Sequence, residues 1–454
     1  MERVFQINLD DVLKLVRGAL ESGNQAQAIA IIQALRPADQ ADVFSELAEE
    51  DRTNLLPNLA PADSADILEE LEDETAAELA ESLSDTDLAR IVDEMEPDEA
   101  ADLLGDLPEE RAETILKSLE DPEEVRPLLM HADESAGGLM TTDFLVLRPK
   151  MRVSEALAAV RELAPTDTAE TLYNLYVVNG NGVLVGVVNL YRLLRADPSA
   201  RVEDVMDPDV IHVRADEDRE VAAKLMSRYD LLSLPVVDER NRILGIITHD
   251  DFVQIVEEEV TEDIQRFGGS SPLEGAYLET PVTRVARRRA GWLLLLFVTE
   301  SLTGSVLRIF EHELQAVVAL TFFIPLLIGT GGNAGSQTTS TIIRGIATGD
   351  IRLKDGLRVL WHELRVGILL GAAMAATGFI RALLWGTPQD VALSVAAALL
   401  MVVTWANLIG SLLPLLASKF HIDPAIVSGP LMSTLVDATG LLIYLGAAKA
   451  ILGL

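Results

Sequence analysis

The most informative single residue in the sequence is Asp437, which lies inside the apolar run 424–452. A carboxylate at membrane depth costs at least ~2.5 kcal/mol on insertion scales, and such residues usually serve an ion or proton pathway. No basic residue lies at a matching depth to neutralise it. Glu300, inside the run 291–310, is a second candidate, although a structural hydrogen bond to a neighbouring helix would explain it equally well.

The metal chemistry open to this chain is that of oxygen ligands. The sequence has no cysteine and only six histidines, which excludes thiolate metal sites and cysteine nucleophiles. Oxygen ligands favour hard cations such as Mg²⁺ or Ca²⁺ over zinc and copper, and they do not exclude Mn²⁺. Because the sequence offers neither a nucleophile motif nor a catalytic pair, we expect no enzymatic activity.

Charge divides the chain into two unlike halves. The net charge of −36 belongs to the first 289 residues, because nine acidic and nine basic residues balance from Ala290 onward. Crowded carboxylates repel one another unless cations bind between them. We therefore expect the acidic half to sense cations in the cytoplasm, and we expect no nucleic-acid partner.

Five long apolar runs follow Arg289, at 291–310, 316–343, 366–385, 391–417 and 424–452. Each reaches the ~20 residues that a helix needs to cross a hydrocarbon core. Arginines and lysines gather before the first run and between the second and third, so the positive-inside rule predicts a cytoplasmic N-terminus and an external C-terminus. With no signal peptide visible, the sequence predicts a multi-pass protein of the bacterial inner membrane.

The second apolar run contains the glycine-rich segment 329–337, GTGGNAGSQ. It is not a nucleotide-binding P-loop, because no Gly-Lys-Ser/Thr follows it. Two interpretations stay open: close packing of helices through small residues, or packing combined with the lining of a pore. Prolines and glycines inside these runs predict broken helices around a watery path, with Gly332, Asn333 and Gly429 as lining candidates.

The acidic half contains an internal repeat of about 12 residues between positions 25 and 125. It is visible in ADVFSEL from Ala41, ADILEEL from Ala65 and ADLLGDL from Ala101. Each copy predicts one short helix with a leucine and isoleucine stripe. Because a short helix cannot bury its apolar face alone, the repeat predicts helices stacked into a small superhelix.

A second repeat relates LYVVNGNGVLVGVVNLYRLL, from Leu175, to LPVVDERNRILGIITHDDFV, from Leu234. Each copy predicts a helix, a strand, a turn, a second strand and another helix. This pattern resembles the paired cystathionine-β-synthase (CBS) domain, which implies a sensor, often for adenosyl nucleotides. An adenine nucleotide is therefore a candidate ligand of the pair.

The segment that follows Asp250, DDFVQIVEEEVTEDIQRFGG, predicts an acidic helix between the sensor and the membrane spans. Its apolar residues fall close to one helical face: Phe252, Ile255, Val256, Val260 and Ile264.

These parts together resemble the MgtE family of magnesium channels over essentially the whole chain. The specific motifs are GTGGNAGSQ, the connector EEEVTEDI and the final DPAIVSGPLMSTLVDATG, which contains Asp437. The fold expected is an α-helical membrane protein with five transmembrane helices, a cytoplasmic α-superhelical N-domain and a tandem α/β CBS pair. The predicted domains are an N-domain (1–137), two CBS domains (138–203 and 204–256), a connecting helix and linker (257–284) and a pore domain (285–454).

The resemblance implies a homodimer whose pore has Asp437 of each subunit at its central site. It also implies regulatory Mg²⁺ sites between N-domain, CBS pair and connecting helix. By matching positions, the regulatory ligands would include Asp218, Glu220, Asp230, Asp251, Glu259 and Glu262. On the N-domain we choose Asp98 and Asp102, a pair four residues apart that would share one face of a helix. Gln254 departs from the family pattern, since an acidic ligand is expected at its position; this weakens the site there or shifts it to a neighbour.

Elementary physics suggests how such a protein would work. Mg²⁺ releases its waters reluctantly, so we expect Asp437 to bind the hydrated ion. The membrane potential supplies ~4.6 kcal/mol per Mg²⁺ for each 100 mV, which makes passive uptake sufficient. Cytosolic Mg²⁺ would close the channel by binding the acidic assembly. The alternatives are a secondary transporter of Co²⁺ or Mn²⁺ and a membrane ion sensor that transports nothing.

Overall fold

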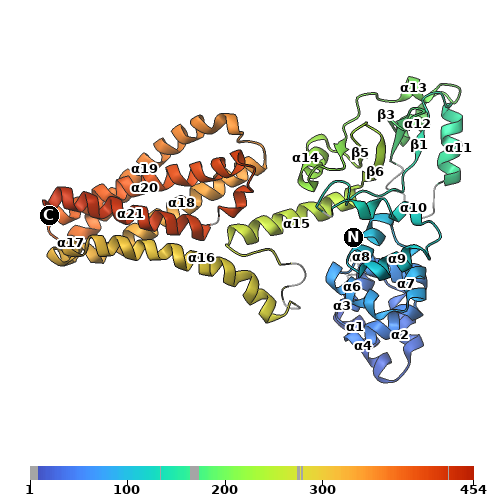
Figure 1. Ribbon diagram of the computed structural model, residues 1–454, viewed down its shortest axis with the longest axis horizontal. Coiled ribbons are helices and arrows are strands. Elements are labelled where there is room, and N and C mark those ends of the chain that lie inside the picture. Colours follow the sequence, from blue (N-terminus) through green and yellow to red (C-terminus); the bar gives the residue numbers. More distant parts are fainter. Residues whose placement is uncertain (1–8, 133, 164–172, 274–276, 278–279, 428) are drawn as a thin grey trace, which may run out of the picture. The chain divides into compact units, whose positions relative to one another are not determined.

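The computed structural model describes residues 9–454 except 133, 164–172, 274–276, 278–279 and 428. The chain divides into two compact units, Met1–Glu259 and Val260–Leu454. The first unit contains the acidic helices and the strands, and the second contains the long apolar helices (Figure 1).

The N-terminal repeat folds into short helices joined by tight turns. In several of them, such as α3, α5 and α8, a proline lies in the first turn, where its missing N–H costs nothing. The elements are α1 Leu9–Glu21, α2 Gln25–Ile32, α3 Pro37–Ser45, α4 Glu49–Leu55, η1 Leu56–Asn58, α5 Pro61–Glu69, α6 Asp73–Ser82, α7 Asp85–Val92, α8 Pro97–Gly105, α9 Glu109–Leu116, α10 Pro122–Val125 and η2 Leu128–Met130.

From α3 onward, most helices of this repeat stack with the second neighbour along the chain, while α1 also packs against α2. One row contains α1, α3, α5, α7 and α9, and the other contains α4, α6 and α8. The aliphatic stripes meet between the rows, where residues such as Leu55, Ile67 and Leu88 are fully buried. The predicted superhelix is confirmed, because each short helix buries its apolar face only against its neighbours.

The CBS pair forms two three-stranded sheets, ordered β1-β2-β3 and β4-β5-β6. In each sheet the first strand is parallel to the second, and the second and third form an antiparallel hairpin. The two hairpins and their helices were predicted, whereas the two-residue strands β1 and β4 were not. The elements are β1 Val146–Leu147, α11 Val153–Leu163, β2 Asn174–Val178, β3 Leu184–Asn189, α12 Leu190–Arg195, α13 Val202–Val205, β4 Val213–Arg214, α14 Arg219–Tyr229, β5 Leu234–Val237 and β6 Ile243–Ile247.

One continuous helix, α15 (His249–Phe267), follows the last strand and crosses the expected domain boundary at 256/257. Of the apolar face predicted for it, Ile255 is buried. Val256, Val260 and Ile264 are 38%, 47% and 67% exposed in the single chain. The second half of the predicted apolar face is therefore largely exposed among the residues that the structure describes.

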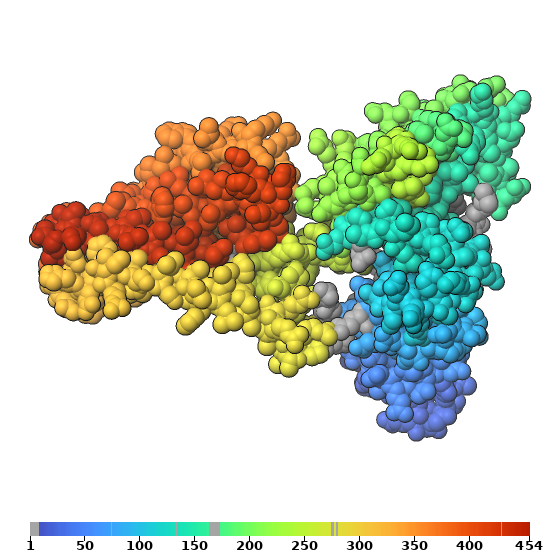
Figure 2. Space-filling view, viewed as in Figure 1, coloured from blue at the N-terminus to red at the C-terminus, as the bar shows by residue number. Residues whose placement is uncertain are grey.

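Among its described residues, the second unit has five helices long and apolar enough to cross a membrane, as predicted. Helix α16 packs along α21, while α18, α20 and α21 pack against one another and α19 packs along α20. Figure 2 shows α16 in yellow beside α21 in red. The elements are α16 Val282–Ile309, α17 Glu311–Ala316, η3 Val318–Phe323, α18 Ile324–Ala347, η4 Leu353–Asp355, α19 Gly356–Leu384, α20 Gln389–Lys419, η5 Pro424–Ile426 and α21 Gly429–Leu452.

The glycine-rich segment 329–337 does not break its helix, contrary to our expectation. It lies within α18, which is continuous for 24 residues, and Pro414 likewise lies inside a continuous α20. Irregular backbone occurs instead before α18, in η3, and before α21, in η5. The helix continues through these glycines because side chains of neighbouring helices pack into the space that glycine leaves free.

Candidate ion pathway and carboxylate clusters

Asp437 lies in α21 with its side chain half-buried. Glu300 of α16, the helix packed along α21, is near enough for the two carboxylates to repel each other. The structure therefore brings together the two intramembrane carboxylates that stood out in the sequence. Two negative charges in a low dielectric repel strongly unless a cation or a proton lies between them. Their arrangement is suited to attract a cation.

The glycines of α18 allow close approach to α21 just before Asp437. A Cβ on Gly331 would lie 2.8 Å from the Val436 side chain, closer than real contacts permit. A Cβ on Gly332 would lie 3.2 Å from Ser433 Oγ, one turn before Asp437. Packing through small residues is thus an observed role of this segment.

The opposite side of α18 is polar and is not covered by any part of the chain that the structure describes. Asn333, Gln337 and Ser340 are all exposed, and their spacing of four and three residues places them on one helical face. Lipid cannot satisfy such groups, so this face needs water or another protein surface. Asn333 is therefore placed where a pore-lining residue should be, whereas Gly332 is buried against α21.

A buried polar cluster joins three of the membrane helices. Thr338 of α18 donates a hydrogen bond of 2.7 Å to Asn407 Oδ1 of α20, and both side chains are buried. Glu363 of α19 lies beside the same threonine. One turn after Glu363, a Cβ on Gly367 would lie 2.9 Å from the α20 backbone, so α19 and α20 are in close contact here. The cluster satisfies polar groups that lipid could not.

Gly429, the first residue of α21, lies beside the end of α15. A Cβ on Gly429 would lie 3.7 Å from the Phe267 ring and 3.8 Å from Ser336 Oγ of α18. Arg266, immediately before Phe267, donates from Nη1 to Asp423 Oδ2 at 2.5 Å. The N-terminal end of α21 is therefore in contact with both the glycine-rich helix α18 and the connecting helix α15.

In the first unit, carboxylates of α8 lie close to those at the start of α15. Asp98 is 6% exposed, and its Oδ1 has no hydrogen-bond partner. Burial, with Asp251 as the largest charged influence, holds the pKa of Asp98 well above its ordinary value. Burial and neighbouring carboxylates raise the pKa of Glu96 to about 7 and that of Glu99 to about 9. Burial likewise raises the pKa of Asp251, against hydrogen bonds from Thr248.

We call Glu96, Asp98, Glu99 and Asp251 the unit-1 carboxylate cluster. Every charged group of the described residues that acts on Glu96, Asp98 and Glu99 is another carboxylate. Such an arrangement is costly until protons or cations neutralise it. Two predicted ligands, Asp98 and Asp251, are thus brought together from positions far apart in the sequence.

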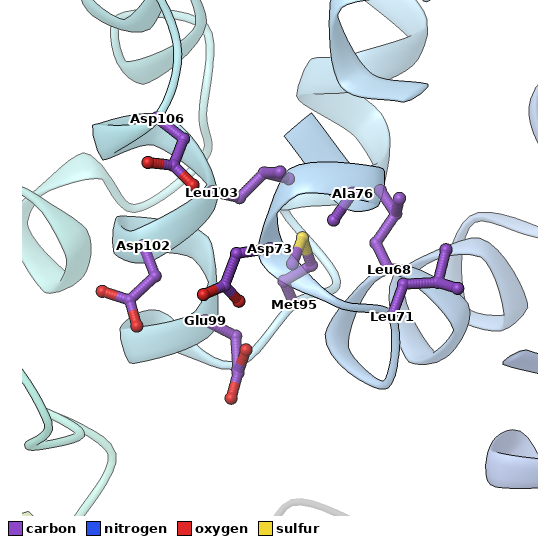
Figure 3. Close-up of a pocket in the computed structure, with 9 residues that line it drawn as sticks. All are labelled: Leu68, Leu71, Asp73, Ala76, Met95, Glu99, Asp102, Leu103 and Asp106. Atoms are coloured by element: carbon purple, nitrogen blue, oxygen red, sulfur yellow. The ribbon is translucent and has the colours of Figure 1, made fainter. Parts of the chain in front are cut away.

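Asp102, one turn after Asp98, is exposed and lines a small pocket of about 20 Å³. Figure 3 shows its carboxylate on the same side of the pocket as those of Asp73, Glu99 and Asp106, with leucine and alanine side chains on the other side. Asp98 and Asp102, which were predicted as a pair of ligands, therefore have different surroundings. Asp98 joins the unit-1 carboxylate cluster, and Asp102 lies on the solvent side.

Three other predicted ligands are on α14 or at its ends, each with a local role. Asp218 caps the helix by accepting a 2.8 Å hydrogen bond from the Glu220 backbone. Glu220 forms an ion pair of 2.6 Å with Lys224. Asp230 ends the helix in the left-handed conformation, with φ of 51°. Asp218 and Asp230 are thus at opposite ends of an 11-residue helix.

Two of the three predicted ligands in α15, Glu259 and Glu262, are paired with arginines. Glu259 and its neighbour Glu258 contact Arg219 of α14 at 3.0 and 2.8 Å. Glu262 forms an ion pair with Arg266 one turn later. Within the residues that the structure describes, no group of three or more His, Asp or Glu side chains converges to hold a metal ion.

Sequence reasoning missed the two arginines and two of the glutamates. Arg219 and Arg266 are isolated basic residues inside acidic segments, and that isolation was the available signal. Glu96 and Glu99 flank the predicted ligand Asp98 in the segment EPDE, but nothing in the sequence shows that they face α15.

Comparison with known proteins agrees with this architecture. Residues 35–134 match the family model described as the MgtE intracellular N domain, and residues 136–199 and 202–258 match the CBS domain. Residues 324–447 match the MgtE model, described as a divalent cation transporter.

Similar curated proteins are magnesium transporters. The chain is 43% identical to magnesium transporter MgtE of Thermus thermophilus over 340 residues, covering 74% of this chain and 75% of the relative. It is 33% identical to magnesium transporter MgtE of Bacillus subtilis over 449 residues, covering 98% and 99%.

A solved structure described as the cytosolic domain of the Mg²⁺ channel MgtE in complex with ATP is 35% identical, with a TM-score of 0.50. The match covers 54% of this chain and 99% of that one. These matches confirm the expected fold and the interpretation as a transporter rather than an enzyme. Since the Bacillus subtilis relative matches along nearly its whole length, the chain belongs to the MgtE family of magnesium transporters.

Proposed function

We propose that this magnesium transporter is a passive channel in which Asp437 binds hydrated Mg²⁺ at the selectivity site. The observation that carries the proposal is that Glu300, exposed on α16, lies within electrostatic reach of the half-buried Asp437 of α21, and that both helices are long and apolar enough to cross a membrane. A divalent cation relieves their repulsion, and its retained waters bridge to the carboxylates. The membrane potential alone drives entry, at ~4.6 kcal/mol per ion for each 100 mV.

The pore is completed by a second copy of the chain in a homodimer. In support, the polar face of Asn333, Gln337 and Ser340 has no cover within one chain. Uncovered polar side chains are costly in lipid, and water between two copies would satisfy them. The N-terminus faces the cytoplasm and the C-terminus the outside of a bacterial inner membrane, since basic residues gather before α16 and between α18 and α19.

Cytosolic Mg²⁺ closes the channel by binding the acidic unit. The unit-1 carboxylate cluster supports this step, because carboxylates whose main charged neighbours are other carboxylates favour any arrangement that a divalent cation can bridge. A ligand shifts a conformational equilibrium only through its differential affinity. The closed arrangement must therefore bring Asp98 and Asp251 closer to a shared ion than the open one does.

The CBS pair is a site for an adenine nucleotide. This proposal draws support from the similar cytosolic domain, which was crystallised with ATP. Nucleotide would act as a regulator, since transport needs no nucleotide hydrolysis in a passive channel. The competing proposal, coupled transport of Co²⁺ or Mn²⁺, uses the same oxygen ligands and differs in its ion preference and energy source.

The test is Mg²⁺ flux into liposomes that contain the purified full-length protein, with little Mg²⁺ on the sensor side. We expect flux in the wild type and a loss of at least about tenfold in Asp437→Ala, equivalent to about 1.4 kcal/mol. The matched control is Asp390→Ala, at the first turn of α20, which should transport normally. Equal flux in wild type and Asp437→Ala would overturn the assignment. A requirement for a proton or sodium gradient would favour coupled transport.

A further inference from the structure

Arg266 joins two carboxylates that approach it from different parts of the chain. Its guanidinium pairs with Glu262, one turn earlier in α15, and donates from Nη1 to Asp423 Oδ2 at 2.5 Å. The side chains of Arg266, Glu262 and Asp423 are 36%, 18% and 29% exposed. This group is therefore half-buried, and solvent screens it less than a surface ion pair.

Arg266 lies close to the N-terminal end of α21, the helix that contains Asp437. Asp423 caps η5 by accepting a 2.8 Å hydrogen bond from the Ala425 backbone, just before α21 begins. Phe267, the residue after Arg266, faces Gly429 at the start of α21. At Gly269, φ is +75°, and a Cβ there would collide with Trp292 of α16 at 2.5 Å. The end of α15 is thus fixed against the beginnings of both helices that contain the intramembrane carboxylates.

The charges of this group balance in a way that those of the unit-1 carboxylate cluster do not. Glu262 and Asp423 would repel each other and attract a divalent cation if they faced each other alone. A guanidinium is always charged, and its planar set of donors can serve two carboxylates at once. Arg266 therefore occupies the position that a metal ion would otherwise fill between a predicted Mg²⁺ ligand and the start of α21.

We propose that Arg266 is a positioning residue, a built-in cation that holds the end of α15 at the entrance of α21 without Mg²⁺. The ion pairs favour the closed channel at every Mg²⁺ concentration, and sensor-side Mg²⁺ completes closure at other carboxylates. The inference rests on the proposed function, because it assumes that the position of α15 controls flux. It also assigns Glu262 to arginine rather than to a metal ion.

The experiment is the liposome flux assay with full-length variants, titrated with Mg²⁺ on the sensor side. We expect Arg266→Gln and Asp423→Asn each to raise the Mg²⁺ concentration for half-closure about tenfold, which corresponds to about 1.4 kcal/mol. The charge exchange Arg266→Asp with Asp423→Arg should return the midpoint toward the wild-type value. Arg287→Gln, an exposed arginine in the first turns of α16, is the matched control and should change nothing.

The charge-exchange variant keeps the inference falsifiable where a single variant misfolds. An unchanged midpoint in Arg266→Gln, or lower flux at every Mg²⁺ concentration, would overturn the role of Arg266 and leave the channel intact. Failure of the proposed function has a different signature: wild-type protein would show no flux, or flux that sensor-side Mg²⁺ does not reduce.

Discussion

Two sets of carboxylates, one around Asp98 in the first unit and one around Arg266 and Lys449 in the second, have opposite surroundings. In the first unit, the largest charged influences on Glu96, Asp98 and Glu99 are other carboxylates, and burial with these neighbours raises the pKa of Glu99 to about 9. In the second unit, Glu262 and Asp423 share Arg266, and Glu313 pairs with Lys449 at 2.5 Å. A hydrogen bond from that lysine holds the pKa of Glu313 below its ordinary value.

This difference distinguishes carboxylates that gain from binding Mg²⁺ or protons from carboxylates that do not. A carboxylate already paired with a cation gains little from Mg²⁺, since binding the ion requires breaking the pair. A carboxylate surrounded by carboxylates gains from any cation or proton that arrives. Under the proposed function, the unit-1 carboxylate cluster is therefore expected to respond to Mg²⁺, and the arginine and lysine pairs are expected to stay fixed.

The largest expected effect comes from removing one charge of the responsive cluster. In Asp98→Asn, the buried repulsion with Asp251 disappears, and with it the reason to bind a divalent cation there. We expect the Mg²⁺ concentration for half-closure to rise between about tenfold and about a hundredfold, equivalent to about 1.4–2.8 kcal/mol. Liposome flux titrated with sensor-side Mg²⁺ measures this midpoint.

The control for Asp98→Asn is Glu94→Gln, an exposed acid just before α8, which should leave the midpoint unchanged. An unchanged midpoint in Asp98→Asn would show that closure does not depend on this cluster. The proposal that the unit-1 carboxylate cluster senses Mg²⁺ would then be wrong.

Protons should replace Mg²⁺ in the responsive cluster. The pKa values of Glu96 and Glu99 are raised from 4.5 to about 7 and about 9. The folded form therefore binds more protons than the unfolded form in this range. Stability from these groups is complete below about pH 4.5 and is lost as the pH rises through about 7 and then about 9.

Calorimetry of the full-length protein without Mg²⁺ should show the transition of the acidic unit moving to lower temperature as the pH rises over that interval. Saturating Mg²⁺ should flatten the dependence, and so should the double variant Glu96→Gln, Glu99→Gln. A transition that moves to higher temperature with pH would contradict the sign of both pKa shifts.

Elements with a regular period were predictable from the sequence. The 12-residue repeat, the two hairpins and the five apolar runs follow from the spacing of apolar residues, and the structure confirms them. Asp437 and Glu300 stood out because a charge is costly in a long apolar helix. The two-residue strands β1 and β4 were not predictable, because Val146–Leu147 and Val213–Arg214 are too short to show a period.

Pairings across the chain could not be predicted from one sequence. Nothing in the sequence indicates that Arg266 reaches Asp423, or that Asp98 faces Asp251. The continuity of α18 was mispredicted for a related reason. Glycine lowers helix propensity, but packing against Val436 outweighs it, and that contact depends on the fold.

The smallest expected effect comes from the fixed pair of Glu313 and Lys449. Lys449 is half exposed, and the pair joins α17 to the last turns of α21 rather than to the connecting helix. Lys449→Met keeps the apolar stem and removes the charge, so we expect a loss of at most about 1 kcal/mol in thermal stability. The Mg²⁺ midpoint for closure should stay at its wild-type value, because we expect the pair to have no role in sensing.

Thermal unfolding and the flux titration measure the two quantities on the same preparation. A midpoint shifted as far as that of Asp98→Asn would mean that fixed charges also set the response, and the distinction between the two units would fail.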